Sequence, residues 1–186
     1  MRKLVAGLFL SLDGVYEAPD QWHFPYFSDE MGATVGEGMA NADALMLGRV
    51  TYQEFASYWP HYEGEGEEKQ FADYLNNVQK YVVSNTLESA DWNNSTIING
   101  DVMDEIRKLK ETPGQNIAMT GSGTLVRSLL RHGLLDELLL LVHPIAVGEG
   151  KKRLFEPDKE RLPLKLLDST TIANGVLKLT YGPADA

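Results

Sequence analysis

Three short polar segments, each placed directly after an apolar run, constrain the fold of this chain more than any other feature. They are Gly48-Arg49-Val50-Thr51 after residues 44–47, Ser84-Asn85-Thr86 after residues 81–83, and Gly121-Ser122-Gly123-Thr124 after residues 117–119. Each is typical of the carboxyl end of a buried strand, and two lead straight into a predicted helix. Ligands of open α/β sheets bind at this edge, and a helix start preceded by glycine favours anions. The three segments therefore indicate a ligand with several phosphates, and a dinucleotide is the leading candidate.

The apolar pattern predicts a mixed α/β sheet. Continuous apolar runs are typical of parallel strands that are covered on both faces. Such runs or shorter strands occupy residues 4–12, 44–47, 80–84, 95–98, 117–120 and 138–143. Two further strands, residues 164–169 and 176–181, are joined around Asn174-Gly175 and predict an antiparallel hairpin at the C-terminal end.

Helices are predicted between these strands, over residues 31–40, 51–58, 101–110 and 124–132, with a helical turn at residues 71–76. Thr51 and Glu54 have the spacing of a capping box at the start of the second helix. Gly133 stands where a left-handed residue commonly ends a helix. No linker or repeat divides the chain, so we predict a single domain over residues 1–186 with three layers, α/β/α, and a mostly parallel sheet.

Composition excludes several classes of function. The 186 residues include no cysteine, which rules out thiol catalysis, zinc–cysteine sites and iron–sulfur clusters. The net charge of −10 argues against binding to nucleic acid or to an anionic membrane. His23 and His143 lack a carboxylate at a metal-binding spacing, so no metal site is expected. The apolar residues 3–12 lack a cleavage site and run into Asp13-Gly14, which favours a buried strand and a cytoplasmic protein.

Each of these polar segments also has a purely structural interpretation. Gly121-Ser122-Gly123 can be a tight turn between a strand and a helix, and Arg49 can be a surface charge. Ser84 and Thr86 can cap a turn, and Asp13 before Gly14 is a common turn signal. The Rossmann fingerprint and the P-loop are both absent.

In order along the chain, the motifs resemble the dihydrofolate-reductase superfamily. They are Ser11-Leu12-Asp13-Gly14, Leu47-Gly48-Arg49-x-Thr51-Tyr52, Val82-Val83-Ser84-x-Thr86 and Gly121-Ser122-Gly123-Thr124-Leu125. The resemblance is closer to the branch that holds the C-terminal reductase domain of the riboflavin-biosynthesis deaminase-reductase. Gly133-Leu134-Leu135-Asp136-Glu137-Leu138, His143-Pro144, Gly148-Glu149-Gly150 and Leu154-Phe155 match the same branch.

The resemblance implies an NADPH-dependent reductase with a dihydrofolate-reductase-like fold. Gly48, Arg49 and Thr51 would lie near the cofactor phosphates. Ser84, Asn85 and Thr86 would flank the adenosine ribose, and Gly121, Ser122, Gly123, Thr124 and Leu125 would approach the pyrophosphate. The nicotinamide would lie against the strand that ends at Leu12 and transfer a hydride to a polarised carbon of the substrate.

The substrate half of the resemblance departs from both relatives. Residues 27–43 contain no Lys or Arg for a phosphoribosyl tail, whereas Asp29 and Glu30 could bind a neutral or cationic heterocycle. Trp22, in the aromatic loop at residues 16–28, is a further candidate for substrate binding. Asp13 is the candidate catalytic residue, as a proton donor after hydride transfer, with a turn-forming role as the alternative.

Two functions follow from this. The first is an NADPH-dependent reductase of a small pteridine-like or pyrimidine-like substrate, resembling dihydrofolate reductase and 5-amino-6-(5-phosphoribosylamino)uracil reductase. The second is a non-catalytic dinucleotide-binding or regulatory protein that keeps the fold. Resemblance to dimeric relatives further implies a homodimer, for which the hairpin and residues 134–142 are the expected interface.

Overall fold

The computed structural model describes residues 1–148, 151–155 and 161–184. Its strands are β1 (Leu4–Ser11), β2 (Ala42–Gly48), β3 (Gln79–Val83), β4 (Ser95–Ile98), β5 (Asn116–Met119), β6 (Glu137–His143), β7 (Leu164–Thr171) and β8 (Leu177–Pro183). Its helices are α1 (Asp29–Ala40), α2 (Arg49–Tyr58), α3 (Glu67–Asn77), α4 (Val102–Glu111) and α5 (Gly123–Arg131), with short 3-10 turns at Pro19–Gln21, Phe24–Tyr26, Trp59–His61 and Ala173–Gly175.

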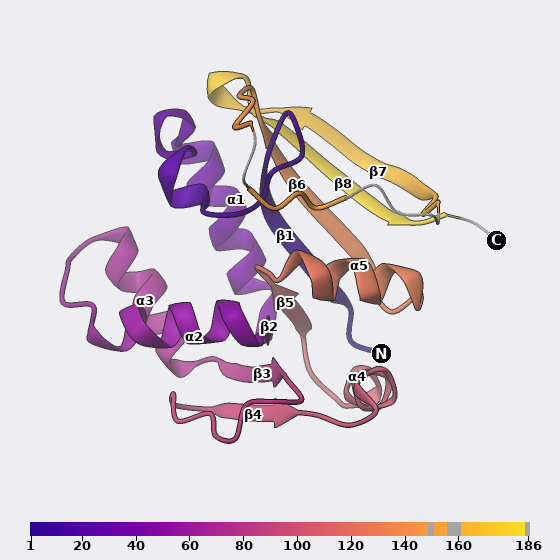
Figure 1. The fold of residues 1–186 in the computed structure, drawn as a ribbon. Coiled ribbons are helices and arrows are strands. Elements are labelled where there is room, and N and C mark those ends of the chain that lie inside the picture. Colours follow the sequence, from indigo (N-terminus) through magenta and orange to yellow (C-terminus); the bar gives the residue numbers. More distant parts are fainter. Residues whose placement is uncertain (149–150, 156–160, 185–186) are drawn as a thin grey trace.

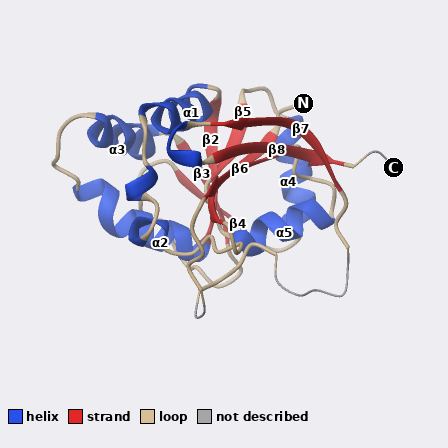
Figure 2. Ribbon diagram, turned by 90° about the horizontal axis from the view of Figure 1, so that it is seen from above, coloured by secondary structure: helices blue, strands red, loops and turns tan. Residues whose placement is uncertain are grey.

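All the strands join in one sheet with the order β4-β3-β2-β5-β1-β6-β8-β7. The first six strands in this order are parallel, and β8 and β7 run antiparallel at one end. Figure 2 shows α1, α2 and α3 on one side of the strands and α4 and α5 on the other. The predicted three-layer α/β/α fold with a C-terminal antiparallel hairpin is confirmed.

The central strand β1 shows why both faces of the sheet are covered. Leu4, Ala6, Leu8 and Leu10 point into the core beneath α4 and α5, where Ile106 and Val126 pack against them. Phe9 points to the opposite face and packs in the cluster that includes Met31 of α1. A strand with a helical layer on each side buries apolar side chains at nearly every position, and this produces the continuous apolar run.

The start of α2 differs from the predicted capping box. The helix begins at Arg49 after Gly48, whose backbone is extended (φ −74°, ψ 158°) and which has no side chain to cap it. Thr51 is therefore the third helical residue rather than the cap. By contrast, Gly133 has the predicted left-handed backbone (φ 63°) at the end of α5.

The hairpin β7–β8 extends beyond the helical layers (Figure 1). Leu166 and Leu167 on β7 are each 51% exposed. In contrast, Leu134, Leu135 and most side chains of β6 are buried inside the protomer, because β6 lies between β1 and β8. That half of the expected dimer interface is wrong, since residues 134–142 supply the protein's own core.

Candidate functional site

The carboxyl ends of β2 and β5 lie next to each other at the middle of the sheet, and we call the region between them the crevice. These strands are parallel neighbours, with Met46 opposite Met119, yet α2 and α5 leave them toward opposite faces of the sheet (Figure 1). Ligands of open α/β sheets bind where adjacent connections diverge in this way. The sequence segments predicted to bind phosphate therefore come together at the expected place in the fold.

The two helix starts approach each other so closely that glycine is required. A Cβ atom on Gly48 would lie 2.9 Å from Oγ of Ser122, and one on Gly121 would lie 3.1 Å from Oγ1 of Thr51. Gly121 also has a positive φ of 152°. The floor of the crevice therefore consists of glycine main chain packed against the side chains of Ser122 and Thr51.

Both helix starts retain backbone N–H groups that an anion can use. In α5, Oγ of Ser122 accepts a hydrogen bond from the Leu125 N–H at 3.3 Å. The N–H groups of Gly123 and Thr124 come earlier in that first turn, where the helix itself offers no acceptor. In α2, Gly48 offers no side-chain acceptor at all. Two positive helix ends thus meet at one crevice, which suits a phosphate or pyrophosphate.

Arg49 and the turn after β3 lie along the same edge. Gly48 is opposite Val83 in the parallel pair, so Arg49 and Ser84 each directly follow the last paired residue of their strands. Arg49 is exposed, and its guanidinium donates to Oε1 of Gln53 at 3.1 Å. It is therefore a surface charge that a ligand at the crevice can recruit.

Ser84 is buried and has the turn-capping role that its alternative interpretation predicted. Its hydroxyl oxygen accepts from the N–H groups of Thr86 at 3.2 Å and Leu87 at 2.9 Å. Asn85 and Thr86 are exposed, and Oδ1 of Asn85 accepts from the Gly100 N–H at 3.1 Å. Of these three residues, Asn85 and Thr86 have side chains that a ligand can reach directly.

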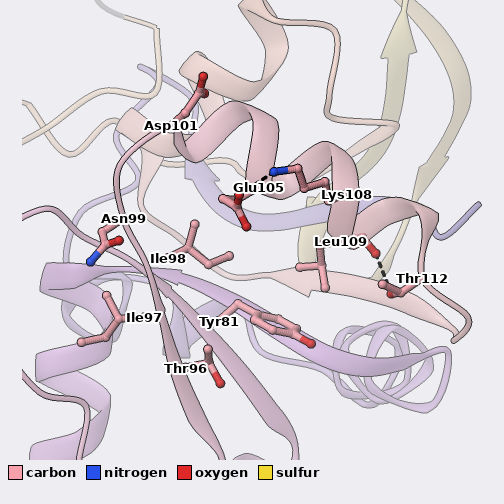
Figure 3. A pocket seen from close by; sticks show the side chains of 10 residues that line it. All are labelled: Tyr81, Thr96, Ile97, Ile98, Asn99, Asp101, Glu105, Lys108, Leu109 and Thr112. Atoms are coloured by element: carbon pink, nitrogen blue, oxygen red, sulfur yellow. Dashed lines mark hydrogen bonds and ion pairs between the residues drawn. The ribbon is translucent and has the colours of Figure 1, made fainter.

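A cavity of about 430 Å³ opens next to this turn, between α4 and the strands β3 and β4. In Figure 3, Tyr81, Thr96 and Ile98 extend from the sheet on one side, and Glu105 and Leu109 extend from α4 on the other. The Ser84 N–H donates to the Ile98 carbonyl at 3.0 Å, so the cavity end at Asn99 adjoins the turn after β3. A group that reaches past Thr86 can continue into this cavity.

Asp13 lies just beyond β1 and is held by four donors. Its Oδ1 accepts from the Ser11 hydroxyl at 2.6 Å and the Val147 N–H at 3.0 Å. Its Oδ2 accepts from the Gly148 N–H at 3.0 Å and from Arg153 at 3.3 Å. The Ser11 hydroxyl and the two N–H groups hold the pKa of Asp13 far below its usual range. The carboxyl group is ionised at neutral pH and has no proton to donate, so these contacts support the structural alternative.

Leu12, the residue after β1, is 71% exposed. Trp22, by contrast, is only 6% exposed, and its indole N–H donates to the Glu17 carbonyl at 3.1 Å. Asp29 is exposed in the first turn of α1, whereas a carboxylate oxygen of Glu30 accepts from the Ala173 N–H at 2.6 Å. In this structure Glu30 secures the turn between β7 and β8, and Asp29 is the more available carboxylate.

An aromatic cage fills the space beside the end of β1. His143, at the end of β6, is fully buried, and rings of Phe9, Trp22, His23 and Tyr26 surround it at centroid distances of 5.6, 5.2, 6.1 and 5.8 Å. We call these five residues the aromatic cage. In the sequence His23 and His143 stand 120 positions apart with no metal-binding spacing, and only the fold brings them together.

Comparison with protein-family models matches residues 2–178 to the RibD C-terminal domain. The chain belongs to this family. Among curated proteins, the uncharacterized protein YyaP of Bacillus subtilis (strain 168) is 31% identical over 181 residues, which are 97% of this chain and 94% of that protein. Both the suspected family and its branch are thus confirmed. Glu149 and Gly150 of one supporting motif lie outside the described residues.

Solved structures show the same fold. A putative riboflavin biosynthesis protein from Shewanella sp. PV-4 matches with a TM-score of 0.77 at 19% identity, covering 98% of this chain and 99% of that one. The diaminohydroxyphosphoribosylaminopyrimidine deaminase/5-amino-6-(5-phosphoribosylamino)uracil reductase of Thermotoga maritima matches with a TM-score of 0.67 at 16% identity, covering 98% of this chain and 57% of that one.

Within the described residues, no helix is long and apolar enough to cross a membrane. The same residues contain no group of three or more His, Asp or Glu side chains that could hold a metal ion.

Proposed function

We propose that this protein is an NADPH-dependent oxidoreductase that transfers a hydride to a small pteridine-like or pyrimidine-like substrate. The observation that carries the proposal is the meeting of two helix starts at one crevice, with Gly48 against Ser122. Such a floor fits the pyrophosphate of a dinucleotide, which needs close main-chain approach and N–H donors. Membership of the RibD C-terminal domain family supports the same assignment.

The chain's own groups have distinct roles in this proposal. The N–H groups of α2 and α5 bind the pyrophosphate, and Arg49 pairs with the phosphate on the adenosine ribose. Asn85 and Thr86 orient that ribose, and the cavity beside Asn99 receives the adenine. When bound, NADPH supplies the hydride, while the end of β1 at Leu12 holds the nicotinamide next to the aromatic cage. Asp13 positions the loop after β1 through its bonds to Val147 and Gly148.

Cofactor titration tests the binding half. We expect NADPH to bind more tightly than NADH, because Arg49 offers a charge-assisted hydrogen bond to the additional phosphate. Arg49→Ala should weaken NADPH binding by about ten- to a hundredfold, since such bonds contribute about 1.5–3 kcal/mol, and should leave NADH binding nearly unchanged. Arg107→Ala, which removes an exposed charge from α4, is the control. If wild type binds NADPH and NADH equally, and Arg49→Ala does the same, the proposed role of Arg49 and the preference for NADPH are refuted.

One observation favours the second candidate function, a dinucleotide-binding protein without turnover. Trp22 and His23 are buried, and His23 stacks on Phe9, beside the end of β1 where the proposed nicotinamide site lies. The two candidates separate in one assay: loss of reduced-cofactor absorbance that depends on an added heterocycle supports the reductase. Cofactor binding with no turnover over a wide panel of pteridines and pyrimidines supports the alternative.

We further propose a single-domain, cytoplasmic homodimer that binds neither nucleic acid nor membranes. Leu166, Leu167 and Leu177 are 51, 51 and 40% exposed, and all three belong to the β7–β8 hairpin. An edge strand with such side chains is a ready partner for a second copy. The hairpin alone, without residues 134–142, is the proposed interface.

A further inference from the structure

The orientation of the His143 ring determines what its free nitrogen can bind. Nδ1 lies 2.8 Å from the Leu141 carbonyl oxygen, which can only accept, so Nδ1 carries the hydrogen. Nε2 then presents a lone pair, and it is buried without a hydrogen-bond partner. Burial lowers the pKa of His143, against the smaller raising effect of the Leu141 and Leu10 carbonyls, so the ring stays neutral. His143 therefore holds an unpaired acceptor at the centre of the aromatic cage.

His23 occupies the position beside it in the way a ligand ring would. Its imidazole stacks on Phe9 with a centroid distance of 4.6 Å and an interplanar angle of 12°. His23 is 7% exposed, yet its Nδ1 also has no hydrogen-bond partner. A buried polar atom left unpaired costs about 1–3 kcal/mol. The cage thus buries two imidazoles and leaves one nitrogen of each ring unpaired, which is an unfavourable way to fill a core.

The loop that carries Trp22 and His23 is attached to the rest of the protein by the burial of these two rings in the cage and by exposed polar contacts. Within it, the N–H groups of Trp22 and His23 donate to the Pro19 carbonyl, and at its start the Tyr16 N–H donates to the Lys152 carbonyl at 3.1 Å. The attachments outside it are a Glu17–Lys152 ion pair at 3.2 Å, a Lys151–Gln21 bond at 2.9 Å, and bonds from Asn174 to the carbonyls of Tyr26 and Phe27. Exposed contacts of this kind contribute little, about 0–1 kcal/mol each. Opening the cage therefore has to break the packing of Trp22 and His23 against Phe9 and His143, and a bound ligand ring would replace that packing.

We propose that the aromatic cage is the subsite that binds the ring of the substrate. His23 and Trp22 close this subsite in the ligand-free protein. Its ligand is a neutral planar nitrogen heterocycle with an N–H donor directed at Nε2 of His143. This inference rests on the proposed function, which places the nicotinamide at the adjacent end of β1. The ring of the ligand replaces His23 on the face of Phe9. Its N–H group supplies the hydrogen bond that His143 lacks.

The chemistry of the cage sets this specificity. Nε2 of His143 is a neutral acceptor among aromatic rings, so an N–H donor on the ligand gains a hydrogen bond there. The cage has no cation that could bind an anionic ring. Leaving Nε2 unpaired in a complex costs more than an ordinary missing bond in water, because the site is dry. A ring that carries only methyl groups at the corresponding nitrogens is therefore rejected. His143 acts as a specificity-determining residue.

Binding of lumazine without any cofactor tests the inference. Its matched control is the dimethyl derivative, in which both pyrimidine-ring N–H groups are methylated. We expect wild type to bind lumazine about tenfold more tightly than the dimethyl form, and His143→Phe to lose this preference while keeping the cage filled. His132→Phe, on the exposed end of α5, should keep it. Isothermal titration at neutral pH gives all the affinities.

A second variant distinguishes the subsite from a purely structural core. His23→Ala removes the ring that competes for Phe9, so lumazine should bind several-fold more tightly than to wild type, whereas damage to a mere core would weaken binding. The inference is overturned if lumazine fails to bind both wild type and His23→Ala at millimolar concentration, or if His143→Phe retains the donor preference. NADPH titration of the same samples is independent: lumazine binding without NADPH binding would reject the proposed function and keep the subsite.

Discussion

Lys80 is one of the largest side chains that the protein buries completely. Its ammonium group donates to the carbonyls of Leu75 at 2.7 Å and Val78 at 2.9 Å, at the end of α3. It also lies 4.4 Å from the centroid of the Trp92 ring. Burial lowers the pKa of Lys80 to about 8. The side chain satisfies the last carbonyls of a helix from inside the core, where water cannot reach them.

Replacing Lys80 by Met should destabilise the protein by about 2–3 kcal/mol, because two buried carbonyls lose their donor. Urea unfolding with linear extrapolation measures the change. The control is Lys69→Met on the exposed face of α3, which breaks a surface pair with Asp73 and should change stability by less than about 1 kcal/mol. Equal effects of both substitutions would contradict the structural role of Lys80.

Asp13→Asn separates the two roles considered for this residue. The amide nitrogen of Asn would face a backbone N–H donor of Val147 or Gly148, so we expect a lower unfolding midpoint. The pKa of Asp13 is lowered in the folded protein, so its contribution is present above pH 3.8 and is lost as the pH falls below that value. The variant should therefore show a flatter acid limb. An unchanged midpoint with a large loss of turnover would instead make Asp13 catalytic.

At the scale of elements, the loop over the aromatic cage couples stability to pH. Burial lowers the pKa of His23, and His143 lowers it further, whereas Asp20 has the opposite effect. Burial likewise lowers the pKa of His143. Below pH 6.5 both histidines take up protons in the unfolded chain but not yet in the folded protein, so the unfolded state binds more protons. The free energy of unfolding should therefore fall as the pH drops below 6.5.

Unfolding curves at a series of pH values check this expectation. The double substitution His23→Phe and His143→Phe should remove most of the slope between pH 6.5 and the acid limb of the carboxylates. His132→Phe is the control, because its ring is exposed at the end of α5. A slope that survives the double substitution would place the titration elsewhere in the molecule.

The periodicity of the apolar residues predicted nearly every helix and strand. The capping and turn residues, however, predicted the wrong end for several of them. The runs at β1, β2 and β6 were readable because both faces of a central strand are covered. The helix α3 was seen only as a turn at residues 71–76, although Glu67 and Glu68 extend it at its positive end. The spacing of Thr51 to Glu54 predicts a cap at Thr51, but α2 begins two residues earlier, at Arg49 directly after Gly48.

The candidate site was predictable only where residues that are neighbours in the sequence form it. Gly48, Gly121 and Ser122 were found from strand-end patterns, and the fold places them together. The pairing of His23 with His143 depends on contacts across the sheet that no local pattern contains. The restraint of Asp13 by Val147 and Gly148 depends on such contacts as well.

At the scale of the whole molecule, the proposed dimer depends on the hairpin. Leu166→Asp places a charge on the exposed face of β7, so light scattering should show the mass of a monomer where wild type shows a dimer. Tyr58→Asp, at a site 54% exposed on α2, should leave the mass unchanged. A monomeric wild type at micromolar concentration would reject the dimer and leave the fold and the crevice untouched.

The position of β1 has a consequence for how the chain emerges from the ribosome. β1 is made first, yet its neighbours in the sheet are β5 and β6, which end at Met119 and His143. Its long apolar run therefore has no strand to pair with until most of the chain has been synthesised. Contacts of such wide separation slow folding and leave apolar surface open in the meantime. A nascent chain of this protein is thus expected to need protection by chaperones until its last parallel strand is available.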